Sequence, residues 1–190
     1  MSTPYKNTQM SGDVVVYRNM NSSERSKVIE GIKEDWMSDH NKEKFNLLPF
    51  MPNILRTDFD VILTSVKYYG LALSMASNEL KGNFEIVTAA VKQNGWSLRV
   101  ASRELRGNKD IVMTAVKNQS FALQFSSDEL RDNFGIVMAA VEQCGYALQF
   151  ASRALTNVSK IVVAAVKNTG YALEYASDRL KSDFNILIVD

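Results

Sequence analysis

Apolar positions recur along the chain at a fixed interval of 25 residues. Three of these positions carry only valine or leucine, and they are Val66, Val91, Val116, Val141 and Val166; Leu73, Leu98, Leu123, Leu148 and Leu173; and Leu80, Leu105, Leu130, Leu155 and Leu180. A period this strict is typical of a repeat architecture. The pattern predicts five copies of one unit, at 58–82, 83–107, 108–132, 133–157 and 158–182, and residues 183–190 begin a sixth.

The first half of each copy has the pattern of a helix. In the second copy, Asn83 is a candidate N-cap, and Ile86, Val87, Ala90 and Val91 fall on one helical face. Threonine, methionine or valine at the next position makes this helix apolar around much of its girth. Such a helix is expected to lie between neighbours and not on an open surface.

Glycine then interrupts four of the five copies, and Ser120 replaces it in the third. We expect this glycine to adopt a left-handed conformation and to end the first helix. In the second copy a second helix follows, with Leu98, Ala101 and Leu105 on its inner face.

A serine recurs inside the second half, at Ser102 in the second copy. In a continuous helix its hydroxyl would bond to the carbonyl four residues earlier. Alternatively, the serine caps a short final turn and divides the second helix in two, which is the interpretation that we favour. In either case it is a packing residue, because no activating base recurs with it as a nucleophile would require.

Short helices of this kind are marginal in water, so neighbouring copies must stack. The sequence therefore predicts an all-α fold, an α-solenoid of five 25-residue helical-pair repeats plus a partial sixth, with an N-terminal helical cap. Residues 1–20 are expected to be an extended or disordered lead, 21–57 the cap with a degenerate half-repeat, and 58–190 the tandem repeats.

Large side chains recur at two positions in the second half of each copy. One position carries Leu71, Trp96, Phe121, Tyr146 and Tyr171, and the other carries Met75, Val100, Phe125, Phe150 and Tyr175. We predict that they pack between copies and do not form a platform for stacked bases or another ligand.

Composition narrows the functional classes. Lysine and arginine total 22 and aspartate and glutamate total 21, so the chain lacks the basic excess of a generic nucleic-acid binder. One histidine, His40, and one cysteine, Cys144, form no metal-ligand cluster, and no phosphate-binding loop is present. We expect no enzymatic activity, no metal and no cofactor. No signal peptide or membrane span is evident, which indicates a cytoplasmic protein, or a protein of a host cytoplasm if it is exported.

The repeats also resemble a known family. The segments AVKQNGWSLRVASRELRGN, AVEQCGYALQFASRALTNV and AVKNTGYALEYASDRLKSD are similar to repeats of domain of unknown function 4116. The resemblance covers about 58–190 and departs from the pattern at Ser120 and Ser126. It assigns no catalytic or binding residues. It implies a host-directed or assembly role, because such families occur in intracellular bacteria, protists and large DNA viruses.

The candidate binding residues are at variable positions, where the repeats differ. After each core leucine, three residues at i, i+4 and i+7 are expected to point outward together, and only the second copy fills all three positions with basic residues. We predict a partner-binding ridge of Arg99, Arg103 and Arg106, with Trp96 and Lys92 beside it. Arginine and tryptophan are enriched in binding hot spots, although such a face can also be merely solvated.

The sequence thus favours a non-catalytic protein-interaction scaffold or adaptor, as a structural subunit of a larger assembly or as a host-directed effector. Its expected partner is another protein with an acidic or phosphorylated segment, and no membrane is involved. The alternative is a nucleic-acid-binding helical repeat protein that uses the basic ridges and the lysines at 67, 92, 117 and 167. A hydrolase or transferase activity within 1–57 ranks last.

Overall fold

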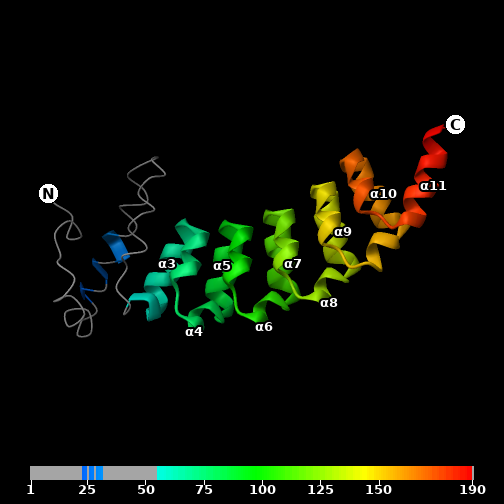
Figure 1. Ribbon diagram of the computed structural model, residues 1–190. Coiled ribbons are helices and arrows are strands. Elements are labelled where there is room, and N and C mark those ends of the chain that lie inside the picture. The colour runs from blue at the N-terminus through cyan, green and yellow to red at the C-terminus, as the bar shows by residue number, and fades with distance from the viewer. Residues whose placement is uncertain (1–22, 25, 28, 32–54, 190) are drawn as a thin grey trace.

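The computed structural model describes the backbone at residues 23–24, 26–27, 29–31 and 55–189, and side chains as far as residue 183. Every regular element between 55 and 189 is a helix, as predicted (Figure 1). The 3-10 helices carry the label η. In chain order the elements are η2 (Leu55–Thr57), α3 (Phe59–Tyr68), η3 (Gly70–Met75), α4 (Asn78–Lys81), α5 (Phe84–Gln93), η4 (Gly95–Val100), α6 (Arg103–Arg106), α7 (Lys109–Asn118), η5 (Ser120–Phe125), α8 (Asp128–Arg131), α9 (Phe134–Gln143), η6 (Gly145–Phe150), η7 (Leu155–Asn157), α10 (Ser159–Asn168), η8 (Gly170–Tyr175) and α11 (Asp178–Val189).

Each copy contains three helices where the sequence predicted a pair. A ten-residue α-helix is followed by a six-residue 3-10 helix and then by a four-residue α-helix. The recurring serine divides the second half, which confirms the favoured interpretation. In the fourth copy η7 replaces the short α-helix.

The backbone around Ser102 shows how the second half divides. The Ala101 N–H donates to the Leu98 carbonyl at 3.2 Å, which closes the 3-10 helix. Ala101 and Ser102 then have extended ψ angles of 156°. The Ser102 hydroxyl accepts a hydrogen bond from the Leu105 N–H at 3.3 Å and so caps the short α6. A serine cap of this kind contributes about 1 kcal/mol.

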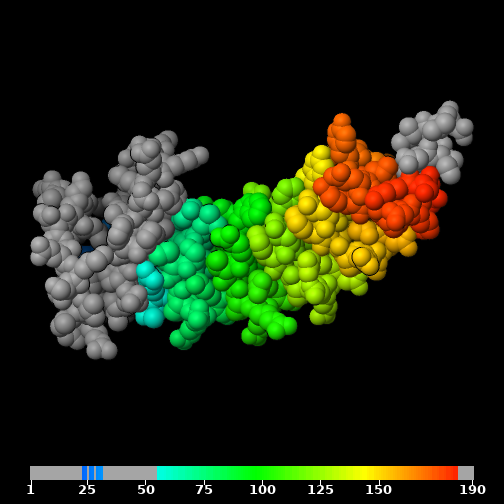
Figure 2. Space-filling view, viewed as in Figure 1, coloured from blue at the N-terminus to red at the C-terminus, as the bar shows by residue number. Residues whose placement is uncertain are grey.

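The helices form two layers in a gently curved row (Figure 1). The long helices α3, α5, α7, α9 and α10 pack side by side in chain order, and the 3-10 helices η3, η4, η5, η6 and η8 form the second layer against them. In the space-filling view successive copies are adjoining bands (Figure 2). The core lies between the layers. Ile86, Val87, Ala90 and Val91 are fully buried there, and Asn83 caps α5 through the Ile86 N–H, both as predicted.

The recurring glycine has a different purpose from the one predicted. No glycine in the described part of the chain has a positive φ. Instead, the recurring glycines start 3-10 helices, and at Gly70, Gly95 and Gly145 the next copy comes very close, whereas a Cβ on Gly170 would meet nothing within 4 Å. A Cβ atom placed on Gly95 would lie 2.4 Å from the Ala115 carbonyl oxygen, and one on Gly145 would lie 2.3 Å from that of Ala165. Glycine is therefore required by the tight contact between copies and not by backbone conformation.

The predicted partial sixth copy does not begin with a new helix. The helix α11 continues without a break from the short-helix position of the fifth copy through Val189. The turn before α5 contains Gly82, whereas Ser182 stands at this position in the fifth copy. The Ser182 hydroxyl donates to the Asp178 carbonyl, and Arg179 pairs with Asp183 one turn later at 3.4 Å. These contacts within the helix favour its continuation.

The expectations for the N-terminal region fall mostly outside the described residues. The lead at 1–20 and His40 lie there entirely. Within the predicted cap, the described residues among 23–31 are helical, and η2 precedes the first complete copy.

Candidate functional site

Side-chain amides join each copy to the one before it. The Asn118 Oδ1 accepts a hydrogen bond from the Gly95 N–H at 2.7 Å, and its Nδ2 donates to the Lys92 carbonyl at 3.0 Å. The same pair of bonds is made by Gln93 to the first copy and by Asn168 to the fourth. We call this arrangement the amide clamp. The clamp was not predicted from the sequence, although an amide residue recurs in four copies, two positions before the glycine or, in the third copy, before Ser120.

One junction has an incomplete clamp. Between the third and fourth copies, Gln143 still donates to the Lys117 carbonyl at 2.8 Å. Ser120 replaces glycine there, and its N–H does not bond to Gln143. Since a Cβ has little room at this position in other copies, the serine explains the loss of the second bond.

The opposite edge of the array has its own ties between copies. The Ser102 N–H donates to the Lys81 carbonyl at 2.9 Å, and equivalent backbone bonds occur at every described junction. The last two junctions add side-chain contacts. The Ser152 hydroxyl bonds to the Asp132 carboxylate, and Ser177 bonds to Asn157 at 2.8 Å.

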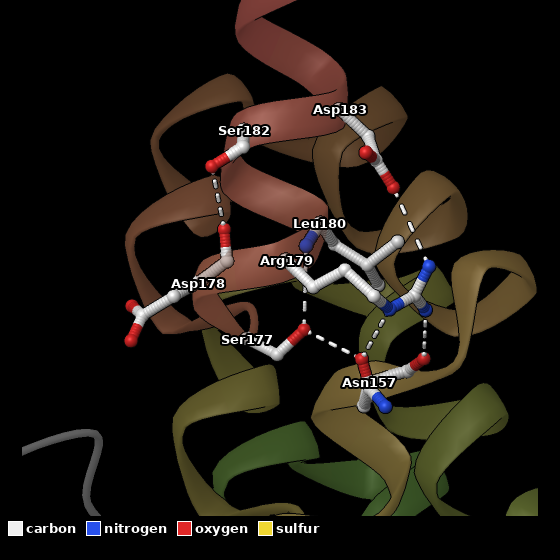
Figure 3. A network of polar contacts seen from close by, with 7 residues as sticks. All are labelled: Asn157, Ser177, Asp178, Arg179, Leu180, Ser182 and Asp183. Carbon is white, nitrogen blue, oxygen red and sulfur yellow. Dashed lines mark hydrogen bonds and ion pairs between the residues drawn. The ribbon is translucent and has the colours of Figure 1, made fainter.

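Figure 3 shows the contacts around Asn157. Its side-chain oxygen also accepts a hydrogen bond from Arg179 Nε at 3.1 Å, and its carbonyl accepts one from another nitrogen of the same guanidinium at 3.0 Å. Arg179 also pairs with Asp183, and the Leu180 N–H donates to the Ser177 hydroxyl. Ser177 and Arg179 join the fifth copy to Asn157 of the fourth, and the remaining contacts lie within the fifth copy, so this polar cluster is structural.

The recurring aromatic side chains pack between copies, as predicted. Trp96 and Phe125 form an edge-to-face pair with ring centroids 5.7 Å apart. The same pairing joins Phe121 with Phe150 at 5.8 Å and Tyr146 with Tyr175 at 6.3 Å. Tyr171 occupies the same position in the fifth copy and is 81% exposed.

Two tyrosines of the array have a pKa above the usual value of a phenol. A hydrogen bond to Glu174 is the main cause that raises the pKa of Tyr175, and burial raises the pKa of Tyr69. Both shifts favour the neutral phenol, so neither group gains acid–base reactivity near neutral pH.

The predicted arginine ridge lies on two helices. Arg99 is in η4, whereas Arg103 and Arg106 are in α6, beyond the extended turn at Ala101 and Ser102. The spacing of four residues from Arg99 to Arg103 therefore lacks the helical geometry on which that prediction depended. Arg99 and Arg103 are exposed. The Arg106 Nε is enclosed by protein without a hydrogen-bond partner.

Trp96 and Lys92 lie on different helices of the second copy, η4 and α5. Trp96 is 36% exposed, and its ring packs against that of Phe125, so part of the side chain is used in the contact between copies. Lys92 is in the last turn of α5, in the layer of long helices. Because the Ser102–Lys81 bond holds the start of α6 beside the end of α4, Lys92 is separated from α6 by the length of α5, about 15 Å. The structure thus places Arg103 and Arg106 on the same short helix, α6, and Lys92 on a different helix.

The outer surface of α3 and α5 contains an open groove of about 610 Å³. The residues that line it are Leu63, Lys67, Phe84, Glu85, Thr88, Ala89, Lys92 and Gln93. Its apolar floor is formed by half-buried Leu63 and Ala89, and Phe84 projects beside them with 51% of its surface exposed. Lysines stand at one end and Glu85 at the other. The groove thus combines a small apolar floor with charged rims.

Among the described residues, the groove has no metal-binding cluster beside it. Across the described residues, no group of three or more histidine, cysteine, aspartate or glutamate side chains is placed to hold a metal ion. Cys144 is half-buried and free. In the same part of the chain, no helix has both the length and the apolar character needed to cross a membrane.

Comparison with known families agrees with the repeat structure. The family described as domain of unknown function (DUF4116) matches residues 58–106, 108–156 and 159–188. Each of the first two matches spans two 25-residue copies, so one family unit corresponds to a pair of the structural repeats. No curated protein and no solved structure matches the chain. Because the family matches cover more than half of the sequence, the chain belongs to the DUF4116 family.

Proposed function

We propose that this protein is a non-catalytic interaction scaffold that binds another protein on the outer surface of its long helices. The observation that carries this proposal is the groove on α3 and α5, with an apolar floor that the stacking of copies leaves uncovered. The recurring glycines, amides and aromatic rings already form the contacts between copies, so they are less available to a partner.

The shape of the array supports this function. Repeat arrays hold their form with the residues that copies share and present an extended surface for partners. On the long-helix surface, the position of Leu63 is occupied by Thr88, Met113, Met138 and Val163 in later copies. The surface therefore varies from copy to copy while the core is constant, which allows recognition of a specific partner.

The test compares two surfaces of the same protein. A groove variant, Phe84→Ser with Ala89→Glu, changes side chains that are exposed or half-buried. The matched variant carries Arg99→Ser, Arg103→Ser and Arg106→Ser on the other helices. Both proteins are used as bait in native lysate, with captured proteins quantified by mass spectrometry after circular dichroism has confirmed folding.

We expect the groove variant to lose the specific partners of the parent, and the arginine variant to retain them. Full retention by a well-folded groove variant would refute the groove as the binding surface. Loss in the arginine variant alone would restore the ridge predicted from the sequence.

Nucleic-acid binding is the second candidate, and a specific feature favours it. Lys67, Lys92 and Lys117 occupy the last turns of successive long helices and are all exposed. A row of cations can follow a phosphate backbone, and its binding would weaken steeply with salt. Tight, salt-dependent binding of RNA by the parent, lost in a variant without these lysines, would favour this function over the first.

A further inference from the structure

A row of three lysines runs along the edge of the groove surface. Lys67, Lys92 and Lys117 stand at the same position in the last turns of α3, α5 and α7, and each is exposed. None of the three has an ion-pair partner among the described residues. Since packed helices are about 10 Å apart, the three ammonium groups are expected at regular intervals along the array.

The row ends sharply at the fourth copy. Glu142 occupies this position on α9, so a ligand that carries negative charge would be repelled there. A footprint limited to α3, α5 and α7 follows. Lys167 on α10 lies beyond this interruption.

The surface beside the row is apolar and then acidic. Leu63, Ala89 and Met113 are half-buried next to it. Glu85 and Asp110 lie in the first turns of α5 and α7, about 10 Å before the lysines along each helix. An inorganic polyphosphate chain has no apolar groups for the middle of this surface, and a nucleic acid is the alternative that the titration below tests. A peptide in the polyproline II conformation has them, and its side chains three residues apart lie on one face about 9 Å from each other, which is close to the spacing of the helices.

From this match we infer that the lysine row binds an acidic protein segment in polyproline II conformation, with carboxylates at every third residue and apolar side chains between them. The segment runs along the array across α3, α5 and α7, and its carboxylates pair with Lys67, Lys92 and Lys117. This inference rests on the proposed function, because it identifies the partner of the same long-helix surface.

The direct test is a fluorescence anisotropy titration of the full chain. The probe is a short fluorescein-labelled peptide with glutamate at every third residue and valine and serine between. A peptide of the same composition with adjacent glutamates tests the spacing, and labelled oligouridylate tests the alternative ligand. We expect the spaced peptide to bind more tightly than the other two probes.

Two charge-matched variants locate the binding. Lys67→Gln, Lys92→Gln and Lys117→Gln remove the row, and Arg99→Gln, Arg103→Gln and Arg153→Gln remove the same charge from other exposed positions. Three exposed ion pairs of ordinary strength correspond to about tenfold in Kd, so we expect the first variant to bind about tenfold more weakly. The second variant should change Kd by less than about twofold.

A third variant tests the interruption. Glu142→Lys continues the row onto α9, so it should tighten binding of a longer spaced peptide several-fold and leave the shorter one unchanged. Equal binding of the spaced and adjacent peptides, equal losses in the two triple variants, or tighter binding of oligouridylate would each overturn the inference. If the groove variant loses its cellular partners while the lysine variant keeps them, the scaffold function stands and only the acidic segment is refuted.

Discussion

The junction between the second and third copies differs from the junction between the third and fourth, although both use the same repeat positions. At the first, Gly95 allows close approach of Ala115, and Asn118 makes both bonds of the amide clamp. At the second, Ser120 replaces glycine and Gln143 keeps one bond. The second junction instead gains a contact on the opposite edge, where Ser152 bonds to Asp132. The polar ties at the two edges therefore vary independently of each other, since the junction between the fourth and fifth copies has both a complete clamp and the Ser177–Asn157 bond.

The largest effect should come from adding one methyl group to the tight junction. In Gly95→Ala the new Cβ would meet the Ala115 carbonyl oxygen at 2.4 Å, so the copies must separate. We expect a loss of about 3 kcal/mol in the free energy of unfolding, even after the smaller entropy of the unfolded chain is allowed for. Denaturant unfolding measures it. Ser120→Ala is the control and should cost well under about 1 kcal/mol, because that position already holds a Cβ. Equal losses would mean that the two junctions are equally tight.

Removing the clamp should have the next largest effect. Asn118→Ala leaves the Gly95 N–H and the Lys92 carbonyl without their partner and should cost about 2 kcal/mol. Gln143→Ala removes one bond and should cost about half as much. Thermal unfolding of the two variants compares them. A larger loss for Gln143→Ala would contradict our account of the incomplete clamp.

Ser97 separates the effect of a polar atom from that of steric crowding. Its hydroxyl is fully buried near Gly70 and has no hydrogen-bond partner, whereas Ala72, Ala122 and Ala147 occupy this position in other copies. Ser97→Ala should stabilise the protein by about 1 kcal/mol, because it removes an unsatisfied buried group. A calorimetric melting temperature below that of the parent would show that the hydroxyl has a partner after all.

The smallest effect on stability is expected from restoring glycine at the third copy. In Ser120→Gly, the side-chain oxygen of Gln143 gains access to the N–H of residue 120. The new bond is offset by the flexibility of glycine in the unfolded chain, so stability should change by less than about 1 kcal/mol. The informative measurement is local. Hydrogen exchange at residue 120 should slow toward that of Gly145, whose N–H is bonded to Asn168. Unchanged exchange would argue that the serine is not what opens the clamp.

The repeat and its core were predictable because their signals are periodic. Valine and leucine at fixed intervals identified buried positions, such as Val116 and Leu123, and Asn83 identified the start of a helix. The 3-10 geometry was not predicted. Apolar side chains such as Leu98 and Ala101 have a spacing that suits either type of helix, and only hydrogen bonds between residues three apart, such as Ala101 N–H to the Leu98 carbonyl, distinguish the 3-10 form.

The candidate site was predictable only in part, because it depends on contacts between copies. Glycine has two structural uses, and the sequence does not show that Gly95 faces a carbonyl of the next copy. The arginine ridge was inferred from helical spacing that ends at Ser102, which separated Arg99 from Arg103. The groove arises where α3 and α5 lie side by side, so Lys67 and Lys92, 25 residues apart in sequence, meet only in the folded array.

The amide clamps also have a consequence for folding kinetics. Each clamp joins residues 23 to 26 positions apart in the sequence, and the core contacts between neighbouring copies have a similarly short sequence separation. Because loops of this length close at little entropic cost, any two adjacent copies can serve as a nucleus from which order spreads one copy at a time. The rate of that spread is then set by the slowest step between neighbours. At the junction between the third and fourth copies half of the clamp is missing, so we expect the spread of order to pause there. We expect unfolding to begin at the same junction.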